Sequence, residues 1–300
     1  MAYFKCGSDS GSTIEIDGVE VDGDLKLKKK VYDIGLKSIP YEFYYGSAAV
    51  YNDEIHIMGT NSSSSYYYSH YKYNGSDWYW VGDLLYPFCG GSSVVYNDEI
   101  HIMGSAYNSN NYTKHFKYNG TSWSNVSTLP YNFYRGGAVV LNDKLHLLGG
   151  SGNQKAHYKY NGTTWVSSTT LPYQFYDGSA VVLNNEIHIL GGNGGKTAHY
   201  KYNGTSWESV STLPYQFYYG SAVVLDNEIH LLGGLSDSST KHYKWNGLIW
   251  ESMGALPYSF NYGSSVVYDD EICILGTNNS LYQKTAYMIA VETYKLSKVS

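Results

Sequence analysis

The sequence predicts an all-β protein built from a repeated unit, and three observations support this prediction. First, the stretch EIHIMG at residues 54–59 returns five times with small changes, which gives six copies in 300 residues. Second, spacings of 45, 45, 42, 42 and 43 residues separate the glycines that open the copies: Gly46, Gly91, Gly136, Gly178, Gly220 and Gly263. Third, each apolar run has the length and alternation of a strand, and none has helical periodicity. Four strands in each of six copies predict a six-bladed β-propeller.

The fourth copy shows the four expected strands in order. SAVVLNN (179–185) is a short β-branched run, and EIHILGG (186–192) alternates and ends in glycine. TAHYKYNG (197–204) alternates again, and TSWESVSTLP (205–214) carries a tryptophan and stops at proline. Asn184-Asn185 and Asn203-Gly204 suit two-residue hairpins with positive φ, so each blade is expected to be a four-stranded antiparallel sheet.

The sixth copy lacks both the Asn-Gly turn and the tryptophan of a fourth strand. The N-terminal segment VYDIGLKSIP (31–40) aligns with TSWESVSTLP of the fourth copy. We therefore expect an N-terminal strand to join the C-terminal blade and to close the ring, which removes the open sheet edges. Residues 31–300 then form the propeller.

Residues 1–30 lie outside the repeat. Within them, residues 12–28 alternate around Asp17-Gly18 and Asp22-Gly23, as short hairpins do. Two interpretations are open: an arm that attaches the propeller to a larger assembly, or a segment without such a role.

The repeat resembles that of the kelch family. The kelch signature is a diglycine after the second strand, a tyrosine late in the third and a tryptophan in the fourth, and Gly191-Gly192, Tyr202 and Trp207 match it in order. The fifth copy has Trp245 in place of the tyrosine, and copies one, two and six replace the second glycine with Thr60, Ser105 and Thr277. The resemblance covers about residues 31–300 and implies a propeller, whereas kelch domains have many functions.

Composition and charge exclude several classes of protein. The net charge is −6 and Arg135 is the only arginine, so the chain lacks the basic face of a nucleic-acid-binding protein. No apolar run approaches the roughly 20 residues that span a bilayer, which predicts no membrane insertion. The first residues contain no apolar core of a signal peptide, and the localisation stays open. Cys6, Cys89 and Cys273 have no zinc-binding spacing.

The ten histidines all belong to the repeat, with one on the second and one on the third strand of five copies. A constant sum of positions predicts that they lie directly opposite each other, next to opposed Glu–Lys pairs. The pairs are His56–His70, His101–His115, His146–His157, His188–His199 and His230–His242, with Glu54–Lys72, Glu99–Lys117, Glu186–Lys201 and Glu228–Lys244. The third copy instead opposes Lys144 and Lys159.

The histidine pairs have two interpretations: metal sites, or hydrogen-bonded groups between packed blades. Two imidazoles without further ligands make a poor zinc site, because zinc takes four ligands. The second-strand histidines cannot share an ion across the ring, because the innermost strand separates them from the axis. We therefore expect structural pairs, no metal and no cofactor.

A binding site is expected where the copies differ and loops converge. The loops that enter the first strands are aromatic, and the repeated Tyr173 and Phe175 are expected to pack between blades. The two positions before the glycine vary most and should surround an exposed mouth at the axis. Arg135 and Asp177 lie there in neighbouring blades, either as a salt bridge or as a polar clamp on a ligand. The candidate ligand-binding residues in these loops are Tyr44, Tyr45, Arg135, Asp177, Tyr219 and Tyr262.

The loops between the second and third strands lie on the same face and are longest in blades six, one and two. They are rich in Tyr, Ser and Asn, a composition typical of adaptable recognition surfaces. The candidate ligand-binding residues in them are Tyr66, Tyr67, Tyr68, Tyr107, Asn108, Tyr112 and Tyr282. Solvated loops in a tyrosine-rich protein are the alternative.

The sequence favours a binding protein over an enzyme. No Ser-His-Asp order, HExxH motif or phosphate loop is present. The histidines belong to the repeat, which leaves none for a copper radical oxidase, and one arginine cannot form the cluster that binds sialic acids. We expect a recognition propeller for a surface glycan or surface protein. Abundant Asn, Tyr and Lys with a single arginine suggest a phage or phage-tail-like fibre. An intracellular protein–protein adaptor and an engineered scaffold without a ligand are the alternatives.

Overall fold

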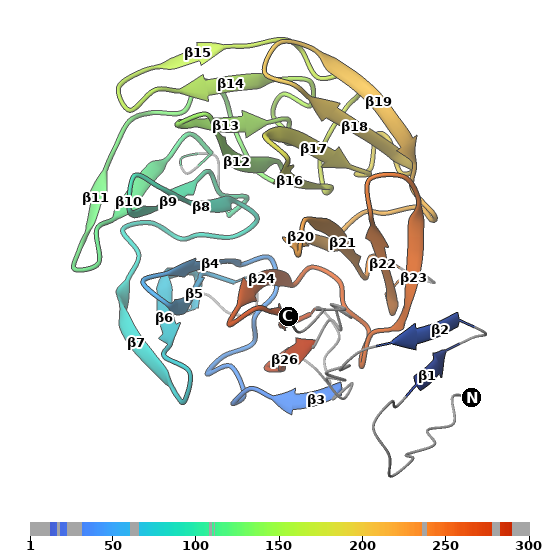
Figure 1. Ribbon diagram of the computed structural model, residues 1–300. Helices are drawn as coiled ribbons and strands as arrows, with labels where there is room; N and C mark the ends of the chain where they lie inside the picture. The colour runs from blue at the N-terminus through green and yellow to red at the C-terminus, as the bar shows by residue number, and fades with distance from the viewer. Residues whose placement is uncertain are drawn as a thin grey trace.

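The computed structural model describes residues 13–16, 19–22, 32–60, 66–107, 110, 112–235, 239–277 and 283–289, with side chains from residue 36 onward except that of Tyr66. Its blades are six four-stranded antiparallel sheets arranged around a central axis (Figure 1). The prediction of an all-β, six-bladed propeller is confirmed.

In blades 1 to 5 the innermost strand comes first in the chain and the other strands follow outward (Figure 1). Blade 1 comprises β4 (Ser47–Tyr51), β5 (Glu54–Met58), β6 (Ser69–Tyr73) and β7 (Trp78–Asp83). Blade 2 comprises β8 (Ser92–Tyr96), β9 (Glu99–Met103), β10 (His115–Tyr118) and β11 (Trp123–Asn125). Blade 3 comprises β12 (Gly137–Leu141), β13 (Lys144–Leu148), β14 (His157–Tyr160) and β15 (Trp165–Ser167).

Blades 4 and 5 repeat this order. Blade 4 comprises β16 (Ser179–Leu183), β17 (Glu186–Leu190), β18 (Ala198–Tyr202) and β19 (Trp207–Thr212). Blade 5 comprises β20 (Ser221–Leu225), β21 (Glu228–Leu232), β22 (Lys241–Trp245) and β23 (Trp250–Ala255). The first three strands of blade 6 are β24 (Ser264–Tyr268), β25 (Glu271–Leu275) and β26 (Ala286–Ile289). A 3-10 turn, η1 (Tyr66–Tyr68), lies between β5 and β6. No helix in the described part of the chain is long and apolar enough to cross a bilayer.

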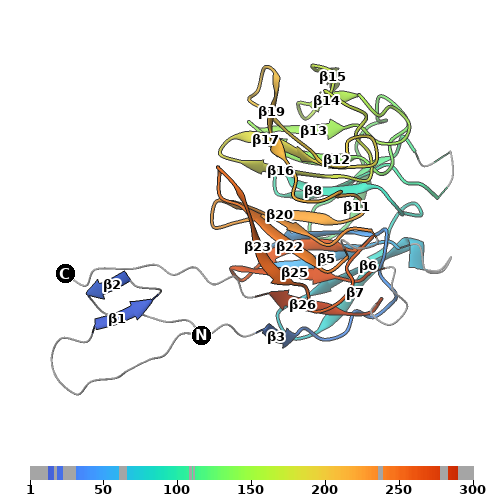
Figure 2. The ribbon, with the colours of Figure 1, turned by 90° about the vertical axis from the view of Figure 1, so that its right-hand side faces the viewer.

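The fourth strand of blade 6 comes from the other end of the chain. Strand β3 (Tyr32–Gly35) pairs antiparallel with β26, and both views show the two side by side (Figures 1 and 2). The predicted closure by an N-terminal strand is therefore confirmed. Strands β1 (Thr13–Ile16) and β2 (Val19–Asp22) form a separate two-stranded hairpin at the first predicted turn. The second predicted turn, at Asp22-Gly23, extends outside the described residues.

The turns between the first and second strands adopt the backbone that the sequence predicts, whereas the Asn-Gly turns do not form the predicted two-residue hairpins. In blade 4 Tyr202 pairs with Trp207, so residues 203–206 form a four-residue loop in which Gly204 has a positive φ and Asn203 does not. Asn184 and Asn185 between β16 and β17 have φ values of 51° and 61°, and the equivalent residues of the other blades are also positive. Two successive positive φ values define the type I′ hairpin, whose twist matches that of the strands. These turns fix the pairing of the two innermost strands in every blade.

Large apolar side chains fill the spaces between neighbouring blades. Phe175 is fully buried in a cluster that contains Val139 and Leu148 of blade 3 together with Ile187 and Ile189 of blade 4. Equivalent phenylalanines are equally buried in the other five blades: Phe43, Phe88, Phe133, Phe217 and Phe260. The repeated phenylalanine packs between blades, as predicted, and Tyr173 packs against the same cluster while its hydroxyl donates to the carbonyl oxygen of Gly191.

The predicted direct opposition of the histidines is wrong by two residues, although the predicted contacts form. His188 lies opposite Lys201, and His199 lies opposite Leu190. The side chains meet along the diagonal, which same-face neighbours two residues away can reach. Nδ1 of His188 lies 2.8 Å from Nε2 of His199, and Nζ of Lys201 lies 3.0 Å from Oε2 of Glu186.

In blade 3 the expected opposition of Lys144 and Lys159 is also absent. Lys159 lies opposite His146 and donates to the Tyr202 hydroxyl of blade 4 at 2.9 Å. A tyrosine of the next blade therefore accepts the hydrogen bond that a glutamate accepts in the other histidine-containing blades.

The histidine pairs belong to a hydrogen-bonded chain between blades. Trp123 of blade 2 donates to Nδ1 of His70 at 3.2 Å, so the proton of that imidazole is on Nε2, which donates to Nδ1 of His56 at 2.8 Å. In blade 4 a serine intervenes: Trp250 donates to Ser211, whose Oγ lies 2.9 Å from Nδ1 of His199. These bonds are the contacts between packed blades that the structural interpretation predicts. Within the described ranges, no group of three or more His, Cys, Asp or Glu side chains is placed to hold a metal.

Candidate functional site

The six loops that enter the innermost strands are joined at the axis by a closed ring of backbone hydrogen bonds. In each, the residue before the opening glycine donates its N–H to the carbonyl oxygen of the equivalent residue in the preceding blade, and the distances are 2.6 to 2.8 Å. The ring consists of Tyr45, Gly90, Arg135, Asp177, Tyr219 and Tyr262, and the last residue accepts from the first. We call these six residues the axial ring.

All six residues of the axial ring have a left-handed backbone, with φ between 57° and 64°. This conformation costs a residue other than glycine about 1 kcal/mol or more. Glycine occupies only one of the six positions, Gly90, so the chain accepts this cost five times. The five side chains line a cavity of about 130 Å³ at the axis, together with the glycines that follow them.

Arg135 and Asp177 form the predicted salt bridge across the boundary between blades 3 and 4. Nε of Arg135 lies 3.7 Å from Oδ1 of Asp177, whose side chain is 2% exposed. Burial raises the pKa of Asp177 to about 6, although Arg135 and the Tyr219 hydroxyl favour its charged form. Its second oxygen, Oδ2, is buried without a hydrogen-bond partner among the described residues. The pair therefore places a half-buried cation beside a strongly buried carboxylate.

The tyrosines of the axial ring pack against one another. The Tyr262 ring lies between those of Tyr45 and Tyr219, with centroid distances of 4.5 and 4.2 Å. The Arg135 guanidinium lies 5.4 Å from the centroid of Tyr45 and donates to its hydroxyl at 3.5 Å. An almost continuous arc of side chains thus runs from Asp177 through blades 5, 6 and 1, and Arg135 joins its two ends across Gly90.

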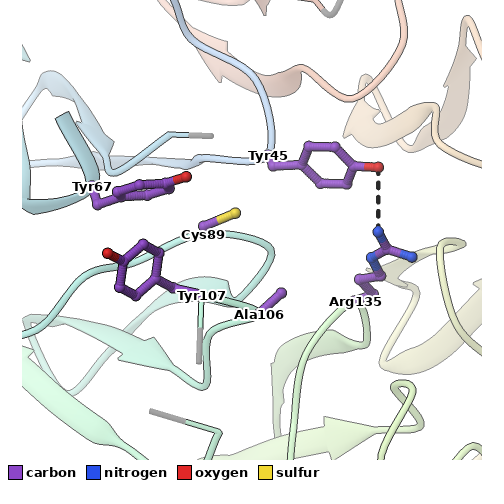
Figure 3. Close-up of a pocket in the computed structure, with 6 residues that line it drawn as sticks. All are labelled: Tyr45, Tyr67, Cys89, Ala106, Tyr107 and Arg135. Carbon is purple, nitrogen blue, oxygen red and sulfur yellow. Dashed lines mark hydrogen bonds between the residues drawn. The ribbon is translucent and has the colours of Figure 1, made fainter. Parts of the chain in front are cut away.

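A pocket of about 320 Å³ opens at the gap in this arc (Figure 3). Its lining residues come from blades 1, 2 and 3: Tyr45, Tyr67, Cys89, Ala106, Tyr107 and Arg135. We call it the tyrosine pocket. The rings of Tyr67 and Tyr107 lie against each other at an interplanar angle of 54°, with centroids 4.4 Å apart, and Cys89 lies between them and Tyr45 (Figure 3). Burial raises the pKa of the Cys89 thiol to about 11, so this thiol is neutral near pH 7.

The hydroxyl residues that replace the second glycine of the repeat support these loops. Ser105 is fully buried, accepts from the N–H of Cys89 at 3.2 Å and donates to the carbonyl oxygen of Pro87 at 2.8 Å. Thr60 and Thr277 make equivalent bonds in blades 1 and 6. In blades 3 to 5 the glycine N–H instead donates to the backbone carbonyl oxygen of the phenylalanine of the next blade, as Gly150 does to Phe175. The replacement therefore coincides with the three blades that have long loops.

The structure brings together seven of the predicted ligand-binding residues. Tyr45 and Arg135 belong to both the axial ring and the tyrosine pocket, Tyr67 and Tyr107 to the pocket, and the ring also contains Asp177, Tyr219 and Tyr262.

The other predicted residues lie outside the tyrosine pocket or outside the described part. Tyr44 has its ring 6.3 Å from that of Tyr45, Tyr68 is exposed, and Tyr112 stacks on Tyr134 at 4.8 Å. Asn108, Tyr282 and the side chain of Tyr66 are not among the described residues.

Two lining residues were not predicted as binding residues. Cys89 and Ala106 have small side chains that are neither aromatic nor charged, so residue type alone does not indicate a binding role. The signal that identifies them is their departure from the repeat: cysteine stands where blades 1, 3, 4 and 5 have tyrosine, at Tyr44, Tyr134, Tyr176 and Tyr218.

Comparisons with known proteins support the fold. No family model matches the sequence, and no curated protein matches it. A solved structure entitled "Structure of YjhT" is similar to this chain, with a TM-score of 0.73 and 16% sequence identity, and the match covers 88% of this chain and 99% of that one. At this identity the likeness concerns the fold alone, and a propeller fold is compatible with a binding role.

Proposed function

We propose that this chain is a non-enzymatic binding module that recognises a glycan on a cell surface. The observation that supports this most is the tyrosine pocket, where three tyrosines and the only arginine of the chain surround about 320 Å³. Ligand pockets are commonly of this size, with rings for contact and a few polar groups for orientation. Sugars need both, because their apolar faces stack on rings while their hydroxyls need hydrogen-bond partners.

The proposal includes the setting that the sequence suggests. The propeller would be a kelch-like domain at the tip of a phage or phage-tail-like fibre, where residues 1–30 would connect it to the particle. The single arginine and the abundance of Asn, Tyr and Lys support this setting.

A glycan array with the full chain tests the proposal, using both the native protein and a multivalent form. We expect a defined set of oligosaccharides to bind. The absence of any hit with either form would contradict glycan recognition and would favour a protein ligand.

Variants then place the bound oligosaccharide. Tyr67→Ala and Tyr107→Ala should each weaken binding by at least about tenfold, or 1.4 kcal/mol, because truncation of an aromatic anchor removes its stacking surface. Titration calorimetry measures the change. A matched control is L248T/I249S, which gives the exposed β22–β23 turn the Thr-Ser sequence of blade 4. Wild-type affinity in both tyrosine variants would place the site elsewhere.

One observation favours a second function, a protein–protein adaptor. Leu248 and Ile249 are 83% and 58% exposed at the turn between β22 and β23, where blade 4 has Thr205 and Ser206. Exposed apolar side chains at one site suit a protein contact. In that case the L248T/I249S variant would lose its partner, while the tyrosine-pocket variants would keep it.

A further inference from the structure

The tyrosine pocket exists because three residues of blade 2 are smaller than their equivalents in the other blades. At the axial ring, Gly90 stands where the other blades have Tyr45, Arg135, Asp177, Tyr219 and Tyr262. One residue earlier, Cys89 replaces tyrosine or asparagine. Ala106, which forms another part of the lining, is the smallest residue at its position, where the other blades have Asn61, Ser151, Asn193, Leu235 and Asn278. Three positions that carry larger side chains in most other blades are therefore small in blade 2. They leave a vacancy, the tyrosine pocket, in the arc of side chains around the axis.

The backbone at Gly90 has room for a side chain that enters the vacancy. A Cβ added to Gly90 would lie 3.4 Å from Cβ of Ala106, 3.8 Å from Cγ of Arg135 and 4.0 Å from Cδ1 of Tyr45, all ordinary contact distances. The φ of Gly90 is 64°, against 58° at Tyr45 and 61° at Tyr219. The backbone therefore has the conformation in which neighbouring blades carry a tyrosine, and only the side chain is missing.

Most residues that line the vacancy carry a polar group. The tyrosine pocket contains three phenol rings, a thiol and a guanidinium, and Ala106 is its only purely apolar lining residue. The Arg135 guanidinium has five N–H donors, and its contacts with the described residues are one hydrogen bond of 3.5 Å, one ion pair of 3.7 Å and the face of the Tyr45 ring. Donors remain for a ligand that carries several acceptors around its edge. A pyranose ring meets this requirement, whereas an aromatic hydrocarbon ring does not.

We infer that the vacancy at Cys89-Gly90 is a subsite for a single pyranose ring, which would take the place of the missing tyrosine beside Tyr45 and Arg135. The ring would contact Tyr67 and Tyr107, and its hydroxyls would accept hydrogen bonds from Arg135. This inference rests on the proposed glycan recognition and names the part of the ligand that enters the pocket. In this inference, the small side chains of blade 2 determine which sugar ring the pocket accepts.

The test fills the vacancy by restoring the repeat. The variant Gly90→Tyr gives blade 2 the residue of blades 1, 5 and 6, and Ala106→Asn gives it the residue of blade 4. The matched control, Asn261→Tyr, adds a tyrosine in the equivalent loop of blade 6, one residue before the axial ring. Unfolding temperatures establish that each variant is folded, and Ala106→Asn keeps the test available if the tyrosine variant does not fold.

Two kinds of probe separate the inference from the proposed function. Methyl pyranosides present one sugar ring, and p-cresol presents the missing tyrosine side chain itself. Saturation-transfer NMR on the full chain measures the binding of each. We expect wild type and Asn261→Tyr to bind at least one methyl pyranoside, and both filled variants to weaken this binding at least about tenfold.

The other outcomes overturn the inference in different ways. Pyranosides that bind wild type and filled variants equally would leave glycan recognition intact and place the subsite elsewhere. Binding of p-cresol without any pyranoside would show that the vacancy takes an aromatic ring, which would contradict both the inference and the proposed glycan class. Absence of binding by every probe would show that the vacancy is not a subsite.

Discussion

At the scale of single residues, the buried histidines make the stability of the protein depend on pH. Burial lowers the pKa of His56 and His188 to about 4 and that of His115 and His199 to about 3. In the unfolded chain these groups titrate near pH 6.5. Below that pH the unfolded state therefore binds more protons, and the free energy of unfolding falls as the pH falls from about 6.5 towards 4. Near pH 7 the histidines are neutral in both states and impose no such loss.

This predicts a lower unfolding temperature at mildly acidic pH. Each pKa unit corresponds to about 1.4 kcal/mol for each group, so several buried histidines together should lower the midpoint steeply between pH 6.5 and 4.5. Asp177 acts in the opposite direction, because its pKa is raised, but it is a single group. Thermal unfolding followed by circular dichroism at a series of pH values measures the slope.

Blade 6 supplies the control for this prediction. It has Cys273 and Ala286 at the positions of the histidine pair, so the H188C/H199A variant gives blade 4 the natural alternative. Its unfolding temperature should depend less on pH than that of the wild type. An unchanged slope would show that this histidine pair does not produce the pH dependence.

The histidine pairs also show what the residue pattern can predict. The repeated spacing places the two histidines on one face of neighbouring strands, and the structure confirms their contact. Direct and diagonal pairing differ by two residues, and a shift of two leaves every side chain on the same face. The sequence pattern therefore cannot distinguish the two registers, because the hydrophobic alternation fits both.

At the scale of secondary structure, strand β3 determines whether the ring is closed. It provides the only partner on the outer side of β26, since the described chain contains no other strand there. An unpaired strand edge is a template for association with other chains. The alignment of residues 31–40 with the fourth strands predicted this arrangement because it preserves the period of the repeat.

Two truncations test the role of β3. Removal of residues 1–35 eliminates β3, and we expect a lower unfolding temperature and self-association through β26. Removal of residues 1–22 eliminates only the separate β1–β2 hairpin and should change the unfolding temperature little. Size-exclusion chromatography and thermal unfolding measure both effects. If the variant without residues 1–35 were monomeric and as stable as the wild type, the role assigned to β3 would be contradicted.

At the scale of the whole molecule, the axial ring links all six blades at one end of the axis. Each of its six hydrogen bonds joins two neighbouring blades, so opening any one of them requires a displacement of a blade. The amides of Tyr45, Tyr219 and Tyr262 should therefore exchange with deuterium as slowly as those of the buried strands, although their side chains are partly exposed. Hydrogen exchange measured by NMR tests this, and loop-like rates at these amides would contradict it.

The axial ring and the tyrosine pocket were the least predictable parts of the molecule. The sequence indicated variable positions at a mouth, and Arg135 and Asp177 as neighbours. The backbone ring depends on a left-handed conformation at residues such as Tyr45 and Arg135, which sequence preference disfavours and tertiary packing imposes. The pocket depends on side chains that blade 2 lacks, and their effect appears only when the neighbouring blades are in place.

The pairing of β3 with β26 also determines how the propeller responds to mechanical load. Tyr32 pairs with Ile289, so the chain enters β3 and leaves β26 at the same end of the pair. Tension between these two points would separate the pairs one at a time, beginning with Tyr32 and Ile289, instead of shearing all of them together. Tension transmitted through β3 alone would instead pass into the ring of blades.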